Sequence, residues 1–213
     1  MTQRGYLDGR EMATTFNMLR ANDLIWSFVV NNYLMGKEPF PFDLLYWNSD
    51  STRMPAAMHS FYLRKCYQEN RLVEPGGITL KGTPIDLREV DIPIYWLSTV
   101  EDHIAPWTAT YKGTQVLGSE DKTFVLAGSG HIAGVVNPPA SGKYGYWLND
   151  ELPTDPDEFL SGAVHQEGSW WSHWAAWNAT FSGGETVPAR EPGDGKLEVL
   201  EEGPGAYVKH RAA

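Results

Sequence analysis

The sequence predicts an α/β fold from two short apolar runs and the segment that joins them. Residues 92–97 (IPIYWL) and 123–127 (TFVLA) are β-branched or aromatic and are bounded by turn residues, as buried parallel strands are. Between them, residues 106–117 suit a helix with Pro106 at its start and Gly118 at its end. The order strand, helix, strand indicates a crossover between parallel strands, which is the repeating unit of an α/β sheet.

Two candidate catalytic side chains directly follow these strands. Asp102 comes after the first run and His131 after the second. In a right-handed crossover both loops lie at the same rim of the sheet, where α/β enzymes place their chemistry. We therefore expect the two residues to be neighbours and to act as the acid and base of a catalytic triad. The same spacing leaves an alternative, in which Asp102 caps the following helix and His131 is an ordinary loop residue. His103 is expected to hold the loop through hydrogen bonds.

A triad in this chain order also needs a nucleophile on a glycine-flanked turn before the acid. No such turn precedes Asp102 in the sequence. Cys66 is the only cysteine, and it lies in a helical stretch without a flanking glycine, so we interpret it as a packing residue. Ser129 and Ser169 have glycine neighbours but follow Asp102. The sequence therefore predicts an acid and a base without their nucleophile.

Three segments are expected along the chain. Residues 1–75 are helical and aromatic-rich, with helices over 22–34 and 55–70. Asn22 or Asp23 is suited to cap the first of these helices and Gly36 to end it, and the aromatic stretch 39–48 is not expected to be regular helix. Residues 76–182 carry the Asp and His loops, and residues 183–213 form a linker and tail with one short strand after Lys196.

Two further elements are predicted within residues 76–182. Residues 78–87 suit a hairpin that turns at Lys81 and Gly82. Four of the tryptophans recur at helical spacing in residues 169–180. We interpret that segment as a helix docked on the sheet by its tryptophans, and the alternative is a contact surface for a partner or polymer.

Composition excludes several classes of protein. The 213 residues carry a formal net charge of -10 with no basic cluster, which argues against nucleic-acid binding. The single cysteine excludes an internal disulfide and fits a reducing cytosol. The six histidines show no metal-ligand spacing, and no apolar run is long enough for a membrane span. We expect a cytoplasmic protein that needs no metal.

Four long motifs carry a resemblance to a known family. They are residues 22–26 (NDLIW), 44–55 (LLYWNSDSTRMP), 101–107 (EDHIAPW) and 128–139 (GSGHIAGVVNPP). In this order they closely resemble the C-terminal part of the catalytic domain of the class I polyhydroxyalkanoate synthases, over about residues 5–193. The upstream region with the nucleophilic cysteine has no counterpart in the sequence. The resemblance thus implies a fragment of such an enzyme or the product of a truncated gene.

The resemblance implies an α/β-hydrolase-type fold, here the C-terminal half of its sheet with a mainly helical cap segment over residues 1–75. It implies an acyltransferase that polymerises (R)-3-hydroxyacyl-CoA into polyester and releases CoA through a Cys-His-Asp triad. His131 matches the base. Asp102 matches the carboxylate that either orients His131 or deprotonates the attacking hydroxyl. No cofactor is implied, because the CoA thioester is a substrate.

The resemblance also implies partners and a location, and it leaves alternatives open. The complete enzyme is expected to be a homodimer that holds the growing polyester chain, in the cytoplasm or at the surface of polyester granules. This chain alone is expected to be inactive without the thiol. The alternatives are a fragment of another α/β-hydrolase, such as an esterase or polyester depolymerase, and a non-catalytic piece that pairs with a full-length synthase.

Overall fold

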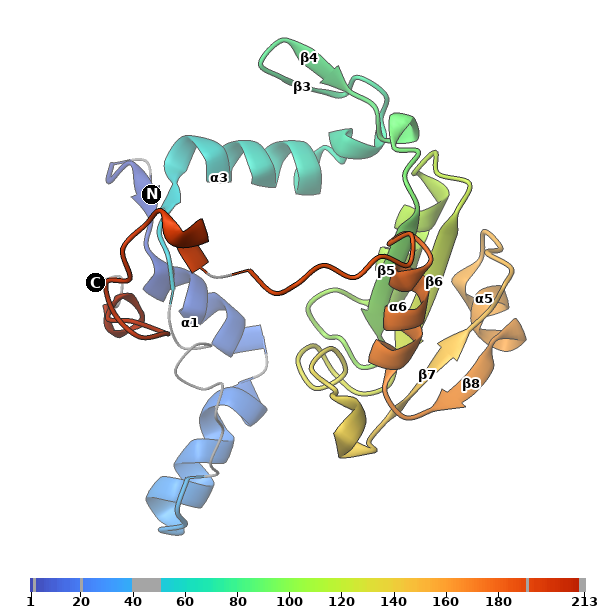
Figure 1. Ribbon diagram of the computed structural model, residues 1–213. Coiled ribbons are helices and arrows are strands. Elements are labelled where there is room, and N and C mark those ends of the chain that lie inside the picture. The colour runs from blue at the N-terminus through green and yellow to red at the C-terminus, as the bar shows by residue number, and fades with distance from the viewer. Residues whose placement is uncertain (2, 20, 40–50, 191, 211–213) are drawn as a thin grey trace. The chain divides into compact units, whose positions relative to one another are not determined.

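The computed structural model describes residues 1, 3–19, 21–39, 51–190 and 192–210 (Figure 1). The chain divides into two compact units. Met1–Asn70 and Ala189–Ala213 form the first unit, and Arg71–Pro188 form the second. Both predicted strands, and with them Asp102 and His131, belong to the second unit.

The first unit is mainly helical. Its strands β1 (Tyr6–Leu7) and β2 (Met54–Pro55) form a short antiparallel pair. Helix α1 (Gly9–Leu19) is followed by two π-helical segments, η1 (Asn22–Trp26) and η2 (Val29–Leu34). Helix α3 (Ala56–Tyr62) continues as the π-helical segment η3 (Leu63–Gln68). The helices predicted over 22–34 and 55–70 are confirmed.

The ends of the helix over 22–34 were predicted only in part. The predicted cap at Asn22 or Asp23 is wrong, because Ala21 before them already has helical dihedral angles (φ −56°, ψ −34°) and makes no side-chain cap hydrogen bond. Gly36 does follow the last helical turn, at a φ of 61° that favours glycine. Residues 40–48 of the aromatic stretch lie outside the described residues.

The short strand expected after Lys196 is wrong for the described part of the tail, residues 192–210. That part contains two 3₁₀ turns, η8 (Pro192–Gly195) and η9 (Tyr207–Lys209). Val199 and Leu200 are 75% and 90% exposed, so this apolar run is not packed against a sheet. An isolated run of this kind forms a strand only where a neighbouring strand accepts its backbone hydrogen bonds.

The second unit contains a four-stranded sheet of order β5-β6-β7-β8. β5 (Ile94–Thr99) and β6 (Lys122–Ala127) are parallel, and α4 (Trp107–Tyr111) with the 3₁₀ segment η6 (Lys112–Gln115) connects them. This confirms the predicted crossover. β7 (Gly145–Leu148) and β8 (Val164–Glu167) add antiparallel neighbours, with α5 (Pro156–Gly162) between them. These three elements were not predicted from the sequence.

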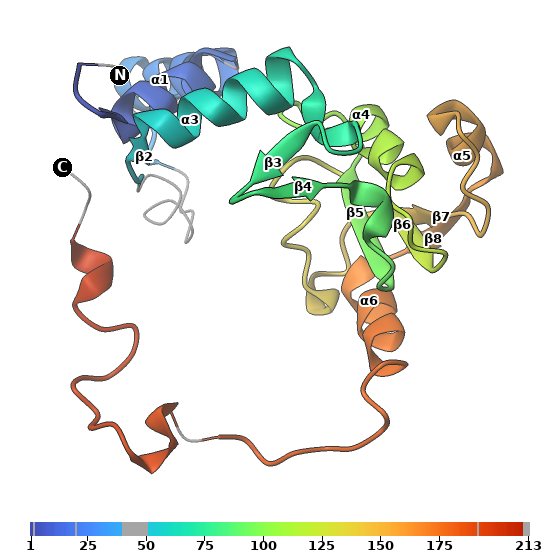
Figure 2. The ribbon, with the colours of Figure 1, turned by 90° about the horizontal axis from the view of Figure 1, so that it is seen from above.

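Both faces of this sheet are covered by helices. On one face, the buried Phe124 packs edge-on against Tyr111 of α4 and Phe159 of α5, with ring centroids 4.9 and 5.1 Å away. On the other face, Val125 packs in a cluster with Trp170 of α6 (Trp170–Ala179). Figure 2 shows α4 and α6 on opposite sides of the sheet. The unit is therefore a layered α/β structure, as predicted.

Helix α6 is docked on the sheet by its tryptophans, as we interpreted it. The rings of Trp170 and Trp177 lie 6.2 and 5.3 Å from the ring of Tyr95 on β5. Trp174 is 44% exposed. Ser169 caps the helix, because its hydroxyl accepts a hydrogen bond from the backbone N–H of Trp171.

The predicted hairpin is also present. β3 (Ile78–Leu80) and β4 (Thr83–Ile85) are antiparallel, and Leu80 is paired with Thr83 across the turn. Lys81 and Gly82 both have positive φ, at 49° and 85°. A two-residue turn with positive φ at both positions has a backbone twist that matches the twist of the two strands it joins.

Candidate functional site

The structure brings Asp102 and His131 together at the carboxyl ends of β5 and β6. His131 Nδ1 lies 2.8 Å from Asp102 Oδ2, so the prediction that the two residues are neighbours is confirmed. Backbone hydrogen bonds continue between the two loops beyond the strands. The N–H of Val100 donates to the carbonyl of Ala127, and the N–H of Glu101 donates to the carbonyl of Ser129. The loops are therefore held to each other by backbone as well as by the side-chain pair.

The Asp102 carboxylate is almost fully occupied as an acceptor. Its Oδ1 accepts the backbone N–H groups of Ile104 and Ala105, both at 2.9 Å, while Oδ2 faces His131. The side chain is 10% exposed. Burial by itself raises the pKa of Asp102, but the hydrogen bonds from Ala105, His131 and Ile104 outweigh it and hold that pKa below its usual value. The carboxylate is thus ionised at neutral pH.

Asp102 does not cap the following helix, so that part of the alternative is wrong. Helix α4 begins at Trp107, and its N-cap residue Pro106 makes no side-chain cap hydrogen bond. The carboxylate instead closes the turn that precedes the helix.

The partnership with Asp102 determines how the His131 ring is oriented. An ionised carboxylate can only accept, so in the neutral imidazole Nδ1 carries the proton and Nε2 has the lone pair. The His131 side chain is 45% exposed, and its Nε2 makes no hydrogen bond to the part of the chain that the structure describes. An imidazole in this state can accept a proton from a group that approaches Nε2.

The other sequence candidates are not part of this pair. His103 is exposed and makes no hydrogen bond within the described residues, so the expectation that it holds the loop is wrong; the Asp102 carboxylate does so. Cys66 is partly buried in η3 of the first unit. The hydroxyl of Ser169 is engaged, since it donates to the carbonyl of Asn137 and caps α6.

Sequence reasoning missed the contacts between α6 and the chain just after His131. The indole N–H of Trp170 donates to the carbonyl of Gly134 (3.0 Å), and that of Trp171 donates to the carbonyl of Val135 (2.9 Å). A signal was present in the sequence, namely two adjacent tryptophans directly after the capping residue Ser169.

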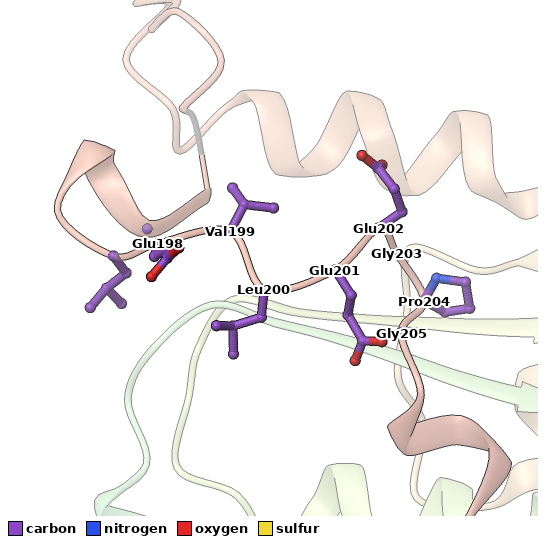
Figure 3. A pocket seen from close by; sticks show the side chains of 10 residues that line it. Glu198, Val199, Leu200, Glu201, Glu202, Gly203, Pro204 and Gly205 are labelled. Atoms are coloured by element: carbon purple, nitrogen blue, oxygen red, sulfur yellow. The ribbon is translucent and has the colours of Figure 1, made fainter.

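Two hollows lie elsewhere on the molecule, each of about 460 Å³. The first is formed by the tail of the first unit, residues 193 and 197–205, and contains glutamates but no histidine or cysteine (Figure 3). One of these glutamates, Glu201, already accepts the backbone N–H of Ala206. The second is an apolar groove in the second unit, lined by Pro139 and five residues of α6. Neither hollow includes Asp102 or His131.

Among the described residues, no group of three or more His, Cys, Asp or Glu side chains is placed to hold a metal ion. Among the helices in the same residues, none combines the length and the apolar character needed to cross a bilayer.

Comparison with known proteins gives closely related sequences. The chain is 55% identical to the poly(3-hydroxyalkanoate) polymerase subunit PhaC of Rhizobium meliloti over 212 residues, which is 100% of this chain and 34% of the relative. It is 47% identical to the corresponding subunit of Cupriavidus necator over 206 residues, 97% of this chain and 35% of the relative. The poly(3-hydroxyalkanoate) polymerase of Methylorubrum extorquens is 49% identical over 213 residues, again with 35% of its length covered. No family model matches the chain.

The chain spans about a third of the length of these curated relatives. The four motifs of the resemblance lie within the matched region, because that region includes the whole chain. The chain is therefore a relative of the poly(3-hydroxyalkanoate) polymerases over its whole length, and it corresponds to about the C-terminal third of such a protein.

Proposed function

We propose that this chain supplies the general base and its orienting carboxylate to a poly(3-hydroxyalkanoate) polymerase of α/β-hydrolase-type fold. The observation that carries the proposal is the 2.8 Å contact between His131 and Asp102 at the ends of adjacent parallel strands. Nucleophilic catalysis needs a base whose free nitrogen is held toward the nucleophile by a third group, and this pair has that form. Its sequence relatives carry the name of a polymerase.

The reaction uses His131 twice. In the first step, its Nε2 takes the proton of a cysteine thiol that lies outside this chain, and the thiolate attacks the carbonyl of an (R)-3-hydroxyacyl-CoA. The bond from the carbonyl to the CoA sulfur breaks, and the departing CoA thiolate takes the proton from the imidazolium. In the second step, Nε2 takes the proton from the hydroxyl of another hydroxyacyl unit, which attacks the carbonyl of the enzyme thioester. The ester bond forms, the bond from the carbonyl to the cysteine sulfur breaks, and the departing cysteine thiolate takes the proton back from the imidazolium. The reaction needs no cofactor or metal, since the CoA thioester is itself the substrate.

We assign Asp102 the orienting role rather than the deprotonation of the attacking hydroxyl. Three hydrogen bonds already engage its two oxygens, and they come from Ile104, Ala105 and His131. The same bonds hold the pKa of Asp102 down despite its burial, which makes the carboxylate a weak base. Both observations support a carboxylate that stabilises the imidazolium of His131.

Exposed apolar side chains of the first unit support the proposal that this unit contacts further polypeptide. At the end of η2, Tyr33, Leu34 and Met35 are 84%, 69% and 58% exposed. Large contiguous apolar patches on a protein surface mark interaction sites, and we propose that these side chains belong to one. We propose that residues 1–75, which include the helices of this unit, are the cap segment of the complete polymerase. We also propose that homodimer formation and a location at the granule surface belong to the complete enzyme.

A chimeric polymerase tests the proposal. In it, this chain replaces the matching third of the Rhizobium meliloti polymerase, to which it is 55% identical. The assay measures CoA release from (R)-3-hydroxybutyryl-CoA and analyses the product, for the chimera and for this chain alone. The chimera with His131→Ala serves as the matched variant.

The proposal expects CoA release and polymer from the chimera, and neither from this chain alone nor from the His131→Ala chimera. Release by this chain alone would reveal a nucleophile within it, Cys66 first. Free 3-hydroxybutyrate in place of polymer would instead indicate a hydrolase. An unchanged rate in the His131→Ala chimera would refute the role of His131.

A further inference from the structure

The chain after His131 forms a turn whose last carbonyl groups have no hydrogen-bond partner inside the turn. Within this turn, the N–H of Gly134 donates to the carbonyl of Gly130 (2.9 Å), and the N–H of Val136 donates to the carbonyl of Ile132 (2.8 Å). The last carbonyls of any helical turn have no partner inside it. Those of Gly134 and Val135 therefore depend on donors from another part of the fold.

The start of α6 supplies these donors. Three consecutive side chains at the start of the helix reach the segment 134–137. The Trp170 and Trp171 indoles donate to the carbonyls of Gly134 and Val135, at 3.0 and 2.9 Å, and the Ser169 hydroxyl donates to that of Asn137. An indole has one N–H donor, and both tryptophans use it in a hydrogen bond to this segment.

Helix α6 is in turn fixed to the strand that ends near Asp102. The hydroxyl of Tyr95 on β5 lies 2.9 Å from His173 Nδ1 on α6, and the rings of Trp170 and Trp177 pack near Tyr95. β5 thus carries Asp102 at its end and α6 on its face. Strand β5 therefore positions both α6, which holds the His131 turn, and Asp102, whose carboxylate contacts His131.

The turn also has little freedom to shift toward the sheet. A Cβ atom added at Gly134 would lie 2.5 Å from the carbonyl oxygen of Gly128 and 2.6 Å from Cγ2 of Thr99. The backbone at Gly134 is therefore closely packed against neighbouring atoms and is also held by the indole hydrogen bonds. A densely packed interior leaves little room for such a segment to move.

We infer that Trp170 and Trp171 are positioning residues for His131. Their indole N–H groups hold the turn in the place from which His131 Nδ1 reaches Asp102 Oδ2. Without them the turn loses two of its anchors, and the imidazole is no longer restricted to the tautomer with the proton on Nδ1. The catalytic consequence rests on the proposed function, but the structural one does not.

The test measures the tautomer of His131 in this chain by ¹⁵N NMR, at a pH where the imidazole is neutral. Trp171→Phe and Trp170→Phe keep an aromatic ring and remove the donor. Trp174→Phe is the matched control, because Trp174 is exposed and makes no hydrogen bond within the described residues. For each lost indole bond, we expect the ratio of the Nδ1–H to the Nε2–H tautomer to fall by up to about five-fold, the factor if the whole of the bond's contribution of about 1 kcal/mol serves to orient the ring.

A tautomer ratio in the Trp170 and Trp171 variants equal to that of Trp174→Phe overturns the inference. If a phenylalanine variant unfolds, the isosteric benzothienyl analogue of tryptophan at position 171 removes the N–H with almost no change in shape. In the chimera, Trp171→Phe should lower kcat about five-fold and leave KM unchanged, whereas Trp174→Phe should change neither. An inactive parent chimera would contradict the proposed function, but the NMR result would still decide the positioning role.

Discussion

Replacement of Asp102 by asparagine should abolish catalysis while leaving the fold almost unchanged. An asparagine keeps an oxygen for the N–H groups of Ile104 and Ala105, but it turns an NH₂ group toward His131. The imidazole must then accept at Nδ1 and carry its proton on Nε2. That tautomer cannot take a proton from a nucleophile, so His131 is lost as a base.

The two expected effects differ greatly in size. One charge-assisted hydrogen bond, of about 1.5–3 kcal/mol, becomes a neutral one of about 1 kcal/mol, so the free energy of unfolding should fall by about 1 kcal/mol. The same change in serine-protease triads lowers the rate on the order of 10⁴-fold, which corresponds to about 5.5 kcal/mol in the activation barrier. A loss of rate on the scale of 10⁴ therefore cannot be explained by partial unfolding.

The assay is pre-steady-state CoA release by the chimera with Asp102→Asn, with a urea titration of the same variant as the control for folding. We expect both acylation and turnover to be lost. A rate within ten-fold of the parent would refute the role of Asp102. A burst of one equivalent of CoA without turnover would show instead that the carboxylate acts on the attacking hydroxyl.

Three further predictions concern the packing around the site. Gly134→Ala should lower chimera activity about 10²-fold, because its Cβ displaces the His131 turn; Gly130→Ala, whose Cβ would lie 3.8 Å from its nearest neighbour, is the control, and equal activities would contradict the packing. Burial lowers the pKa of His173, so its contribution to stability is present above the unfolded value near 6.5 and is lost as the pH falls through that value toward the folded pKa. His173→Phe should flatten this part of the pH dependence of the urea midpoint, and an unaltered pH profile would refute the assignment. Phe124→Ala should lower the free energy of unfolding by about 3–5 kcal/mol, since Phe124 is 1% exposed; calorimetry showing a loss under 1 kcal/mol would contradict its place in the core.

The elements that could be predicted from the sequence are those whose signal is local. The runs at 92–97 and 123–127 are continuous and apolar, so they indicate strands buried on both faces, and the structure has them as β5 and β6. The hairpin turn at Lys81 and Gly82 and the helix end at Gly36 depend on backbone angles that a few neighbouring residues determine.

Other elements escaped prediction because their reason lies elsewhere in the chain. β7 and β8 are four residues each and gain stability from pairing with β6 and with each other. The run that includes Leu200 has similar apolar character, yet it forms no strand because it has no such neighbour within residues 192–210. His103 was expected to hold its loop, but the carboxylate of the adjacent Asp102 accepts the N–H groups of Ile104 and Ala105 instead.

Sequence alone is enough to identify which residues could carry out acid and base chemistry and at which end of the strands they lie. Asp102 and His131 each follow a continuous apolar run. Such a run predicts a buried strand from its own residues, whatever the rest of the fold is. The tertiary structure alone decided that the two side chains meet at 2.8 Å and that Trp170 and Trp171 hold the turn after His131. The physical reason is that a hydrogen bond needs its donor and acceptor within about 3 Å, and for residues far apart in sequence only the packing of helix on sheet brings them that close.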